Sequence, residues 1–388
     1  MRIIQFTVGA YHPTKADGTK QTIYHLSRNL AALGHDVAVF AIDDDPATSP
    51  IKGVEVRNFP STRFKYGLSD ELQEALREWQ PDIVHLHSSY NIASAGVAHW
   101  LQRNQIPYTV TTHGNLNKYL LRRRWYVKYP YKYLVQLPYF NEAEFIHEVG
   151  DIADCHQYGV TVPVECVPNG INVNIQRVDE ALFLDRFPQL KDKRLYLFIG
   201  RLDPYQKGLE YAIRAFAKAD LPDSRLALVG PDHKGSLSTL MTLVDTLGMT
   251  EQIIFTGPLY DEDKLSALAA ADVFVHTSLW EGHSFSILEA MANGVPCLVT
   301  TGADPQGMVV DGESGYRATG LTVEEITTQF KKVAQATDEE LALMGQNARR
   351  IVEQNYTWKD VTCEMIRLYK KYLHQPAERH ATDQTELA

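Results

Sequence analysis

Short runs of β-branched and aromatic residues alternate with segments of helical periodicity along this chain, and that alternation limits its possible folds more than any other feature. Strands are predicted in the first half at 2–8, 36–42, 53–58, 82–87, 107–112, 144–149 and 163–167. Strands are predicted in the second half at 194–199, 225–230, 252–257, 272–277 and 296–300. Strands that are joined by helices form parallel sheets covered by helices. The chain is therefore predicted to be α/β.

The chain is long enough for two domains. Its 388 residues allow each domain to bury a core of its own. The segment 170–192 is predicted to separate them, which gives domains at 1–170 and 171–357. A helix is predicted at about 358–373, where one face carries Trp358, Val361, Met365, Leu368 and Tyr372. The polar residues 375–388 are predicted to be disordered.

Charge and composition exclude several function classes. The net charge is −10, from 38 basic and 48 acidic residues, which argues against a general nucleic-acid-binding protein. The apolar run at 1–8 is too short for a signal peptide, and no stretch of about 18 apolar residues predicts a transmembrane helix. Four cysteines without a C-x-x-C pair are interpreted as buried, reduced thiols: Cys155, Cys166, Cys297 and Cys363. A cytoplasmic protein is therefore expected.

Two glutamates, Glu281 and Glu289, form the first candidate site. The strand predicted at 272–277 precedes Glu281, and the helix after it carries Glu289 about one turn in. Backbone N–H groups at such a helix N-terminus favour anions, and a carboxylate beside them accepts hydrogen bonds from hydroxyl groups. This combination suits a sugar nucleotide. For an arbitrary pair of glutamates, a solvated helix face would be the ordinary interpretation.

A second motif places two cations after a different strand. The strand predicted at 194–199 ends in a loop that carries Arg201 and Lys207, and a helix follows from about 210 to 219. Arginine suits bidentate phosphate contact, and lysine contacts phosphate as a point charge. The two cations are predicted to neutralise a diphosphate, although two surface cations would give the same pattern.

Together the two motifs resemble the family-4 retaining glycosyltransferases. The family pattern is G-R-L…K-G followed by S-x-x-E-G…L-E-A-M-A-x-G-x-P, and residues 198–300 match it in order and spacing. Weaker matches at Gly18, Gly34-His35, His113-Gly114 and 167–171 extend the resemblance to about residue 373. It implies the GT-B architecture, in which two Rossmann-like domains with parallel sheets face a central cleft. The first domain would bind the acceptor and the second the nucleotide sugar, and the last helix would return to the first domain.

The resemblance also implies roles for individual residues. The catalytic residues that it implies are His113, Arg201, Lys207 and Glu281. The donor-binding residues that it implies are Gly18, Gly282, His283, Ser284, Phe285 and Glu289, with Glu289 on the ribose hydroxyls. The chain departs from the family pattern at one place in the loop that contacts the donor sugar. The family often has Phe-Gly where this chain has His283-Ser284.

The implied reaction transfers a hexose from a UDP-sugar or GDP-mannose to an acceptor hydroxyl, with retention of the anomeric configuration. No carboxylate pair of the retaining glycosidase kind is visible. The family is thought to use a front-face route in which the leaving phosphate assists the acceptor's proton loss. The nucleotide sugar is a co-substrate, so no cofactor is expected. The expected acceptor is a saccharide or a lipid-linked saccharide, and the expected pathway is bacterial polysaccharide biosynthesis.

Three other functions are compatible with a similar fold. A sugar-nucleotide epimerase would bind the nucleotide but need no acceptor. A phosphorylase would need a lysine for pyridoxal phosphate, for which this chain shows no clear place. A non-catalytic nucleotide-binding partner subunit would lose motif residues, whereas the main charged residues are present here.

Two clusters, one of aspartates and one of histidines, contain side chains that could ligate a metal ion. The run 43–45 contains three aspartates and could be a D-x-D manganese site, but two cations already supply positive charge and GT-B enzymes typically need no metal. His85 and His87 are expected on opposite faces of their strand, so that they cannot readily share an ion. No metal site is predicted.

The segment 118–132 is unusual in an acidic protein, because it has six cations, five aromatic rings and no acid. Cations attract anionic lipid, and tryptophan and tyrosine favour the headgroup zone. The segment is therefore interpreted as a membrane-facing or acceptor-facing surface, and the protein as peripheral on the inner face of the cell membrane. Its main candidates are Arg122, Arg123, Arg124, Trp125 and Lys128. A solvated helix face is the alternative, while RNA binding has no support elsewhere in the chain.

Overall fold

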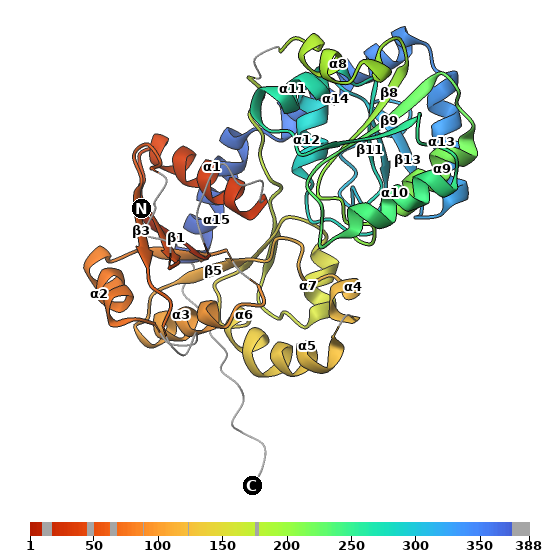
Figure 1. The fold of residues 1–388 in the computed structure, drawn as a ribbon. Helices are drawn as coiled ribbons and strands as arrows, with labels where there is room; N and C mark the ends of the chain where they lie inside the picture. The colour runs from red at the N-terminus through yellow and green to blue at the C-terminus, as the bar shows by residue number, and fades with distance from the viewer. Residues whose placement is uncertain are drawn as a thin grey trace.

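The structure is a computed structural model that describes residues 1–9, 18–44, 50–62, 68–87, 89–122, 124–174 and 178–374. It contains two α/β domains, each built on a parallel sheet, which confirms the predicted fold class (Figure 1). Arg123, residues 10–17 and the tail predicted at 375–388 lie outside the described residues.

The first domain has a seven-stranded parallel sheet in the order β3-β2-β1-β4-β5-β6-β7. Its strands are β1 (Arg2–Val8), β2 (Asp36–Ile42), β3 (Glu55–Phe59), β4 (Ile83–Leu86), β5 (Tyr108–Thr111), β6 (Ile146–Glu148) and β7 (Val164–Cys166). Its helices are α1 (Gly18–Ala32), α2 (Asp70–Trp79), α3 (Ile92–Arg103), α4 (Lys118–Arg122), α5 (Trp125–Tyr131), the π-helix η1 (Lys132–Gln136), α6 (Leu137–Phe140) and α7 (Ile152–Tyr158).

Alternate residues of each strand face two different cores of the first domain. Ile4 and Phe6 of β1 pack in one core with residues of α2 and α3. Ile3 packs in the other core with Leu26 of α1. Because both faces of the sheet are covered, its strands are apolar nearly throughout rather than alternately polar.

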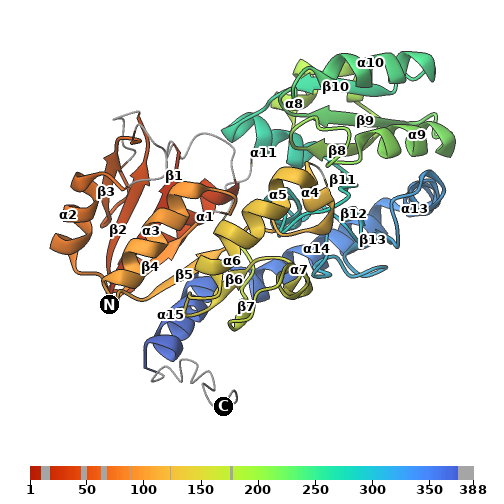
Figure 2. The same cartoon turned by 90° about the horizontal axis from the view of Figure 1, so that it is seen from below.

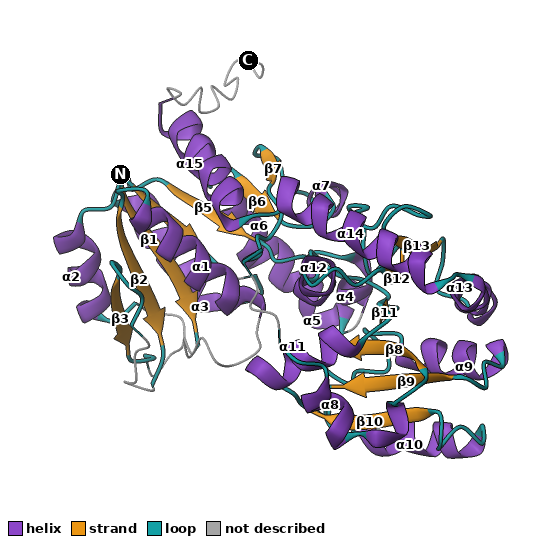
Figure 3. Cartoon of the chain, turned by 90° about the horizontal axis from the view of Figure 1, so that it is seen from above, coloured by secondary structure: helices purple, strands orange, loops and turns teal. Residues whose placement is uncertain are grey.

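The second domain has a six-stranded parallel sheet in the order β10-β9-β8-β11-β12-β13. Its strands are β8 (Arg194–Ile199), β9 (Ser224–Val229), β10 (Ile253–Gly257), β11 (Val273–His276), β12 (Cys297–Thr300) and β13 (Gly315–Ala318). Its helices are α8 (Ala181–Arg186), the 3₁₀ helix η2 (Pro188–Leu190), α9 (Leu209–Ala219), α10 (Ser236–Thr246), α11 (Asp261–Ala270), α12 (Phe285–Ala292), α13 (Val323–Gln335) and α14 (Asp338–Asn355). These helices lie on both sides of the sheet (Figure 3).

Every predicted strand is present, but β13 was not predicted. It is only four residues long and contains no β-branched residue, so the sequence carries no strand signal there. It pairs with β12 and completes the edge of the second sheet.

The last helix, α15 (Trp358–His374), crosses back to the first domain (Figure 2), where it contacts α1. Its apolar face joins the core that contains Ile3 and Leu26. Trp358 stacks on His25 of α1, with ring centroids 5.0 Å apart. The chain therefore passes between the domains twice, once near Gly170 and once near Trp358.

All four cysteines are free, but the prediction of burial is only half right. Cys155 and Cys297 are buried. Cys166 is exposed at the end of the edge strand β7, and Cys363 is exposed on the outward face of α15. Among the described helices, none combines the length and the apolar character that crossing a bilayer requires.

Candidate active site

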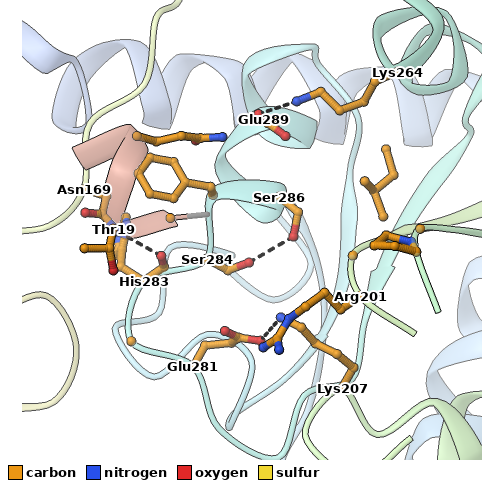
Figure 4. Close-up of a pocket in the computed structure, with 18 of the residues that line it drawn as sticks. Thr19, Asn169, Arg201, Lys207, Lys264, Glu281, His283, Ser284, Ser286 and Glu289 are labelled. Atoms are coloured by element: carbon orange, nitrogen blue, oxygen red, sulfur yellow. Dashed lines mark hydrogen bonds and ion pairs between the residues drawn. The ribbon is translucent and has the colours of Figure 1, made fainter. Parts of the chain in front are cut away.

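A cleft of about 630 Å³ lies between the domains and is lined by both of them. The first domain contributes Gly18, Thr19, Gln21, His113, Asn115, Val149 and Asn169. The charged residues of the second domain that line the cleft are Arg201, Lys207, Asp261, Lys264, Glu281 and Glu289. All ten residues predicted to be catalytic or donor-binding therefore lie on one cleft (Figure 4).

The topology explains why these residues meet. Arg201 follows β8, Glu281 follows β11 and His113 follows β5. In parallel sheets the carboxyl ends of the strands share one edge, and ligands bind outside that edge. Because the strand ends of both sheets border the same cleft, residues more than 80 positions apart in sequence line it together.

Lys207 and Glu281 form an ion pair at the centre of this group. The ammonium lies 2.5 Å from Oε1 of Glu281, and the two side chains are only 12% and 13% exposed. The Ser278 hydroxyl donates to the same oxygen at 2.6 Å, and Nε2 of His276 lies 3.2 Å from it. Among the described residues all of these contacts go to Oε1, which leaves Oε2 to accept a hydrogen bond from a ligand hydroxyl.

The surroundings of Glu281 fix its charge. Burial alone raises the pKa of a carboxyl group, but the Lys207 ammonium and the hydrogen bond from His276 outweigh it and hold the pKa of Glu281 well below its usual range. Burial also lowers the pKa of His276, so its ring is neutral at pH 7. Glu281 is therefore a permanent anion that can accept hydrogen bonds but has no proton to give.

Arg201 lies in the same cleft but is exposed. Its guanidinium donates to Oε1 of Gln206 at 3.0 Å, and it makes no ion pair with any described residue. The Gln206 carbonyl in turn accepts from the Leu279 N–H at 2.8 Å, which ties this loop to the one that carries Glu281. The guanidinium is therefore held near Lys207 with most of its donors available to an anion.

Glu289 has a partner that the sequence did not reveal. Lys264 of α11 lies 2.7 Å from Oε1 of Glu289, and both side chains line the cleft (Figure 4). Lys264 lies on a helix that begins with three acids, and no local sequence pattern marks it as a partner of Glu289. The pair adds a third cation to the donor side of the cleft.

The loop before α12 contacts the first domain through small groups. A Cβ atom added to Gly114 would lie 2.5 Å from Cα of Gly282, so a side chain at Gly114 has no room. The side chain of Asn169 donates to the His283 carbonyl at 3.0 Å and accepts from the Thr22 hydroxyl at 3.0 Å. These contacts seat the loop against both α1 and the loop after β5.

The start of α12 is formed by Ser284 and Phe285. The Ser284 hydroxyl lies 3.1 Å from that of Ser286 and does not cap the helix. The Phe285 ring packs closely against Gly18, where an added Cβ would lie 3.3 Å away. The first N–H groups of α12 consequently remain available to an anion in the cleft.

His283 is a buried imidazole without a hydrogen-bond partner. Neither of its ring nitrogens has one among the described residues, and its ring lies 5.4 Å from that of Tyr356. Burial lowers the pKa of His283 to about 3. The ring therefore substitutes for an aromatic group in packing, while its backbone carbonyl makes the contact with Asn169.

His113 has a left-handed backbone, with φ of 52°, and lines the cleft. Its Nε2 lies 3.2 Å from Nδ1 of His87, whose other nitrogen contacts Gln5 at 2.5 Å. Burial, with the neighbouring His147, lowers the pKa of His113 to about 3. His113 therefore offers a neutral imidazole to the cleft.

The expectation that His85 and His87 face opposite ways is wrong. Their rings stack with centroids 4.1 Å apart, because residues two positions apart on a strand share a face. His85 contacts the Tyr369 hydroxyl at 2.6 Å, so α15 completes a buried hydrogen-bond network. No group of three metal-ligating side chains was found among the described residues. Asp44 accepts from Ser61, and Asp45 lies outside the described residues.

The predicted segment 118–132 forms α4, α5 and the first residue of η1 on the first domain, and we call residues 118–136 the basic aromatic segment. Six large apolar side chains here are between 43% and 78% exposed: Trp125, Tyr126, Val127, Tyr129, Tyr133 and Leu134. Arg122 and Arg124 are exposed beside them. Lys128 instead turns inward, where its ammonium donates to the Leu120 carbonyl and lies 5.1 Å from the centroid of the Tyr90 ring.

Both halves of the chain match domains of known glycosyltransferases. The glycosyltransferase family 4 domain matches residues 16–175, and the glycosyl transferases group 1 domain matches residues 183–351. The chain is 24% identical to the MMP alpha-(1->4)-mannosyltransferase of Mycolicibacterium hassiacum, over 94% of this chain and 97% of that protein. It is 26% identical to the UDP-Gal:alpha-D-GlcNAc-diphosphoundecaprenol alpha-1,3-galactosyltransferase of Escherichia coli, over 76% of this chain and 78% of that protein.

A solved structure shows the same fold. HepE of Anabaena, in complex with UDP, superposes with a TM-score of 0.77 at 18% identity, over 96% of this chain and all of that one (100%). The two domain matches follow each other along the chain, as the two sheets do. The chain is therefore a glycosyltransferase with the GT-B fold, whose first part matches the glycosyltransferase family 4 domain.

Proposed function

We propose that the protein transfers a hexose from a nucleotide diphosphate sugar to a hydroxyl group of a lipid-linked saccharide, with retention of configuration and without a metal ion. The observation that carries this proposal is the arrangement of Arg201 and Lys207 beside Glu281 in one cleft. Two cations next to a permanent anion match a diphosphate next to sugar hydroxyl groups. The E. coli relative, whose name gives UDP-Gal as donor, supports a donor of this class.

In the proposed reaction the bond between the anomeric carbon and the diphosphate oxygen breaks, and the acceptor oxygen bonds to that carbon on the same face. The acceptor's proton passes to the leaving phosphate. Arg201 and Lys207 stabilise the negative charge that develops on the diphosphate, which is an electrostatic contribution that often dominates catalysis. Glu281 cannot supply a proton, because its pKa is held low. It positions the donor sugar through its hydroxyl groups instead.

The rest of the cleft has proposed roles in donor binding. Glu289, held by Lys264, accepts from the ribose hydroxyls. The first N–H groups of α12, at Ser284 and Phe285, face phosphate or sugar oxygens. Gly18 and Gly282 allow the backbone to approach the donor closely. His113 approaches the sugar as a neutral ring.

The acceptor is proposed to lie in a membrane. Apolar and cationic side chains gather on α4, α5 and η1, and Tyr119 of α4 contacts Trp280, the residue before Glu281. The E. coli relative, whose name gives a diphosphoundecaprenol-linked acceptor, supports an acceptor of this chemistry. We place the protein on the inner face of a bacterial cell membrane, in polysaccharide biosynthesis, with Arg122, Arg124 and Trp125 against anionic lipid.

A thermal-shift panel tests the donor proposal directly. UDP, GDP, UDP-glucose, UDP-galactose and GDP-mannose are compared at equal concentrations. A ligand at 100 times its Kd adds about 2.7 kcal/mol of stability. Stabilisation by one nucleotide series, smaller in a Glu289→Ala variant, is expected. No stabilisation by any of them would contradict nucleotide-sugar binding. An epimerase would convert the bound sugar without an acceptor, whereas a transferase releases nucleoside diphosphate mainly when an acceptor is added.

A further inference from the structure

An aromatic stack joins the two domains beside Glu281. The rings of Tyr119 in α4 and Trp280 are nearly parallel, with centroids 6.0 Å apart and planes inclined by 22°. Tyr205 meets the same Trp280 ring edge-on at 5.5 Å. Trp280 is only 8% exposed, although it lies on a loop. The residue directly before Glu281 is therefore contacted by an aromatic ring from each domain.

Tyr119 is held firmly by the first domain. Its N–H donates to Oδ1 of Asn117 at 3.0 Å, and the amide of Asn117 donates to Asp154 of α7 at 2.9 Å. The Lys118 ammonium lies 5.6 Å from the centroid of the Tyr119 ring. Although α4 is only five residues long, α7 thus anchors the end of it that carries Tyr119.

The loop of Trp280 is attached to its own domain by the two residues that directly precede the tryptophan. The Leu279 N–H donates to the Gln206 carbonyl at 2.8 Å, and the Thr300 hydroxyl donates to the Ser278 carbonyl at 2.8 Å. Across the cleft, the backbone of Gly282 touches Gly114. That glycine contact sets how closely the two loops approach, but glycine has no side chain that could hold them together. The Tyr119 ring is a side chain that contacts the loop of Trp280 from the first domain.

We infer that Tyr119 is a positioning residue for Glu281, and that it couples α4 and the rest of the basic aromatic segment to the donor site. A displacement of α4 moves the Tyr119 ring and with it the stacked Trp280 ring. Because Trp280 and Glu281 are adjacent in the chain, the backbone transmits that movement to Glu281. The positioning role stands on the ring geometry. The coupling to a bilayer also rests on the membrane surface proposed above.

Amide hydrogen exchange in the ligand-free protein tests the positioning role, and it needs neither donor nor acceptor. In Tyr119→Ala we expect exchange across 278–284 to become about tenfold faster, since an aromatic pair of this kind adds stability beyond its buried area. Tyr119→Phe keeps the ring and should behave like the wild type. Tyr133→Ala, an exposed tyrosine of the same segment, is the matched control. Unchanged exchange at 278–284 in Tyr119→Ala, or faster exchange over the whole chain, would overturn the role.

Phosphatidylglycerol vesicles test the coupling. Vesicles should slow exchange at 278–284 in the wild type and in Tyr119→Phe, but not in Tyr119→Ala, although all three co-sediment. Equal slowing in Tyr119→Ala would show that the stack does not carry the coupling. If the wild type does not bind vesicles, both the membrane surface and the coupling are wrong, while the vesicle-free result still decides the positioning role. Failure of nucleotide binding in the thermal-shift panel would leave both exchange results unaffected.

Discussion

The Lys207 ammonium lies 2.5 Å from Oε1 of Glu281 and joins the loops that follow β8 and β11. Both side chains are nearly buried, so each charge depends on the other as its partner. A diphosphate that contacts Lys207 must share the cation with Glu281. Arg201, which makes no ion pair with a described residue, is free of that competition.

Alanine at Lys207 and at Arg201 should affect activity alike but stability differently. Each substitution removes a contact that strengthens in the transition state, so turnover should fall about a hundredfold, or roughly 3 kcal/mol. Lys207→Ala also leaves the Glu281 carboxylate without its partner, which should cost roughly 3 kcal/mol of stability. Arg201→Ala should change stability by less than about 0.5 kcal/mol, because Arg201 is exposed.

Steady-state nucleotide release and urea denaturation measure these two effects. The double variant Lys207→Ala/Glu281→Ala is the control, since it removes both charges and should regain part of the lost stability. Near wild-type turnover in both single variants would remove the diphosphate assignment.

Lys264 should affect nucleotide affinity indirectly, because it holds the Glu289 carboxylate in place. We expect Glu289→Gln to weaken UDP or GDP binding about tenfold, because a charge-assisted hydrogen bond becomes a neutral one. Lys264→Met should weaken it less, since Glu289 remains but is no longer held. Lys218→Met removes an exposed cation that pairs with Glu324 in the same domain and should leave affinity unchanged. Isothermal titration calorimetry measures the nucleotide affinity of each variant. If all three variants have the same affinity, Glu289 does not contact the ribose.

Donor turnover should survive EDTA. Arg201 and Lys207 place two cations in the cleft, so they can neutralise a diphosphate without a metal ion. Nucleotide release is measured before and after dialysis against EDTA, and again with manganese or magnesium restored. Activity that disappears on chelation and returns with manganese would overturn the metal-independent proposal.

His283→Phe should stabilise the protein and flatten its response to acid. Both ring nitrogens of His283 are buried without a partner among the described residues, so an apolar ring should gain roughly 1 to 3 kcal/mol at pH 7. The folded-state pKa of about 3 lies below the ordinary 6.5, so protonation favours the unfolded state. Stability is therefore lost as the pH falls from about 6.5 towards 3.

The slope that one such histidine adds over this range is at most about 1.4 kcal/mol per pH unit. Chemical denaturation at several pH values between 7 and 4 should show a smaller slope in His283→Phe than in the wild type. Other histidines whose pKa is lowered, including the half-buried His113 with its pKa of about 3, keep part of the slope in both proteins. An unchanged slope would mean that His283 is solvated or protonated in the folded state.

The basic aromatic segment should bind anionic vesicles in a salt-dependent way. Each cation near such a surface contributes about 1 kcal/mol, and salt weakens that contribution by screening. Glutamine at Arg122, Arg123 and Arg124 should abolish co-sedimentation with phosphatidylglycerol but not nucleotide binding. Glutamine at three arginines of the second domain, Arg186, Arg214 and Arg350, should change neither. If the wild type does not co-sediment with anionic vesicles at low salt, the segment is a solvated helix face.

Local sequence patterns were enough to predict most of the fold. Apolar runs of strand length predicted every strand except β13, whose residues Gly315–Ala318 carry no β-branched side chain. The motif spacing predicted that Arg201, Lys207 and Glu281 line one site, because each follows a strand and parallel strands end at one edge. Their catalytic roles remain predictions.

Partners that come from distant segments could not be predicted. Lys264 pairs with Glu289 from another helix, and His87 meets His113 from a neighbouring strand end. The inward turn of Lys128 likewise depends on the Leu120 carbonyl and the Tyr90 ring. No local pattern encodes such contacts, because they depend on how whole elements pack.

The sequence by itself determined the parallel α/β class, the order of the strands along the chain and the loops that carry the charged motifs, since these follow from periodicity within short windows. Only the tertiary structure decided which charges pair, which histidines are buried, and that Tyr119 reaches Trp280 across the cleft. Those features arise where separate elements pack together, within one domain or between the two. Burial and distance there depend on both packed surfaces, and no short stretch of sequence contains both of them.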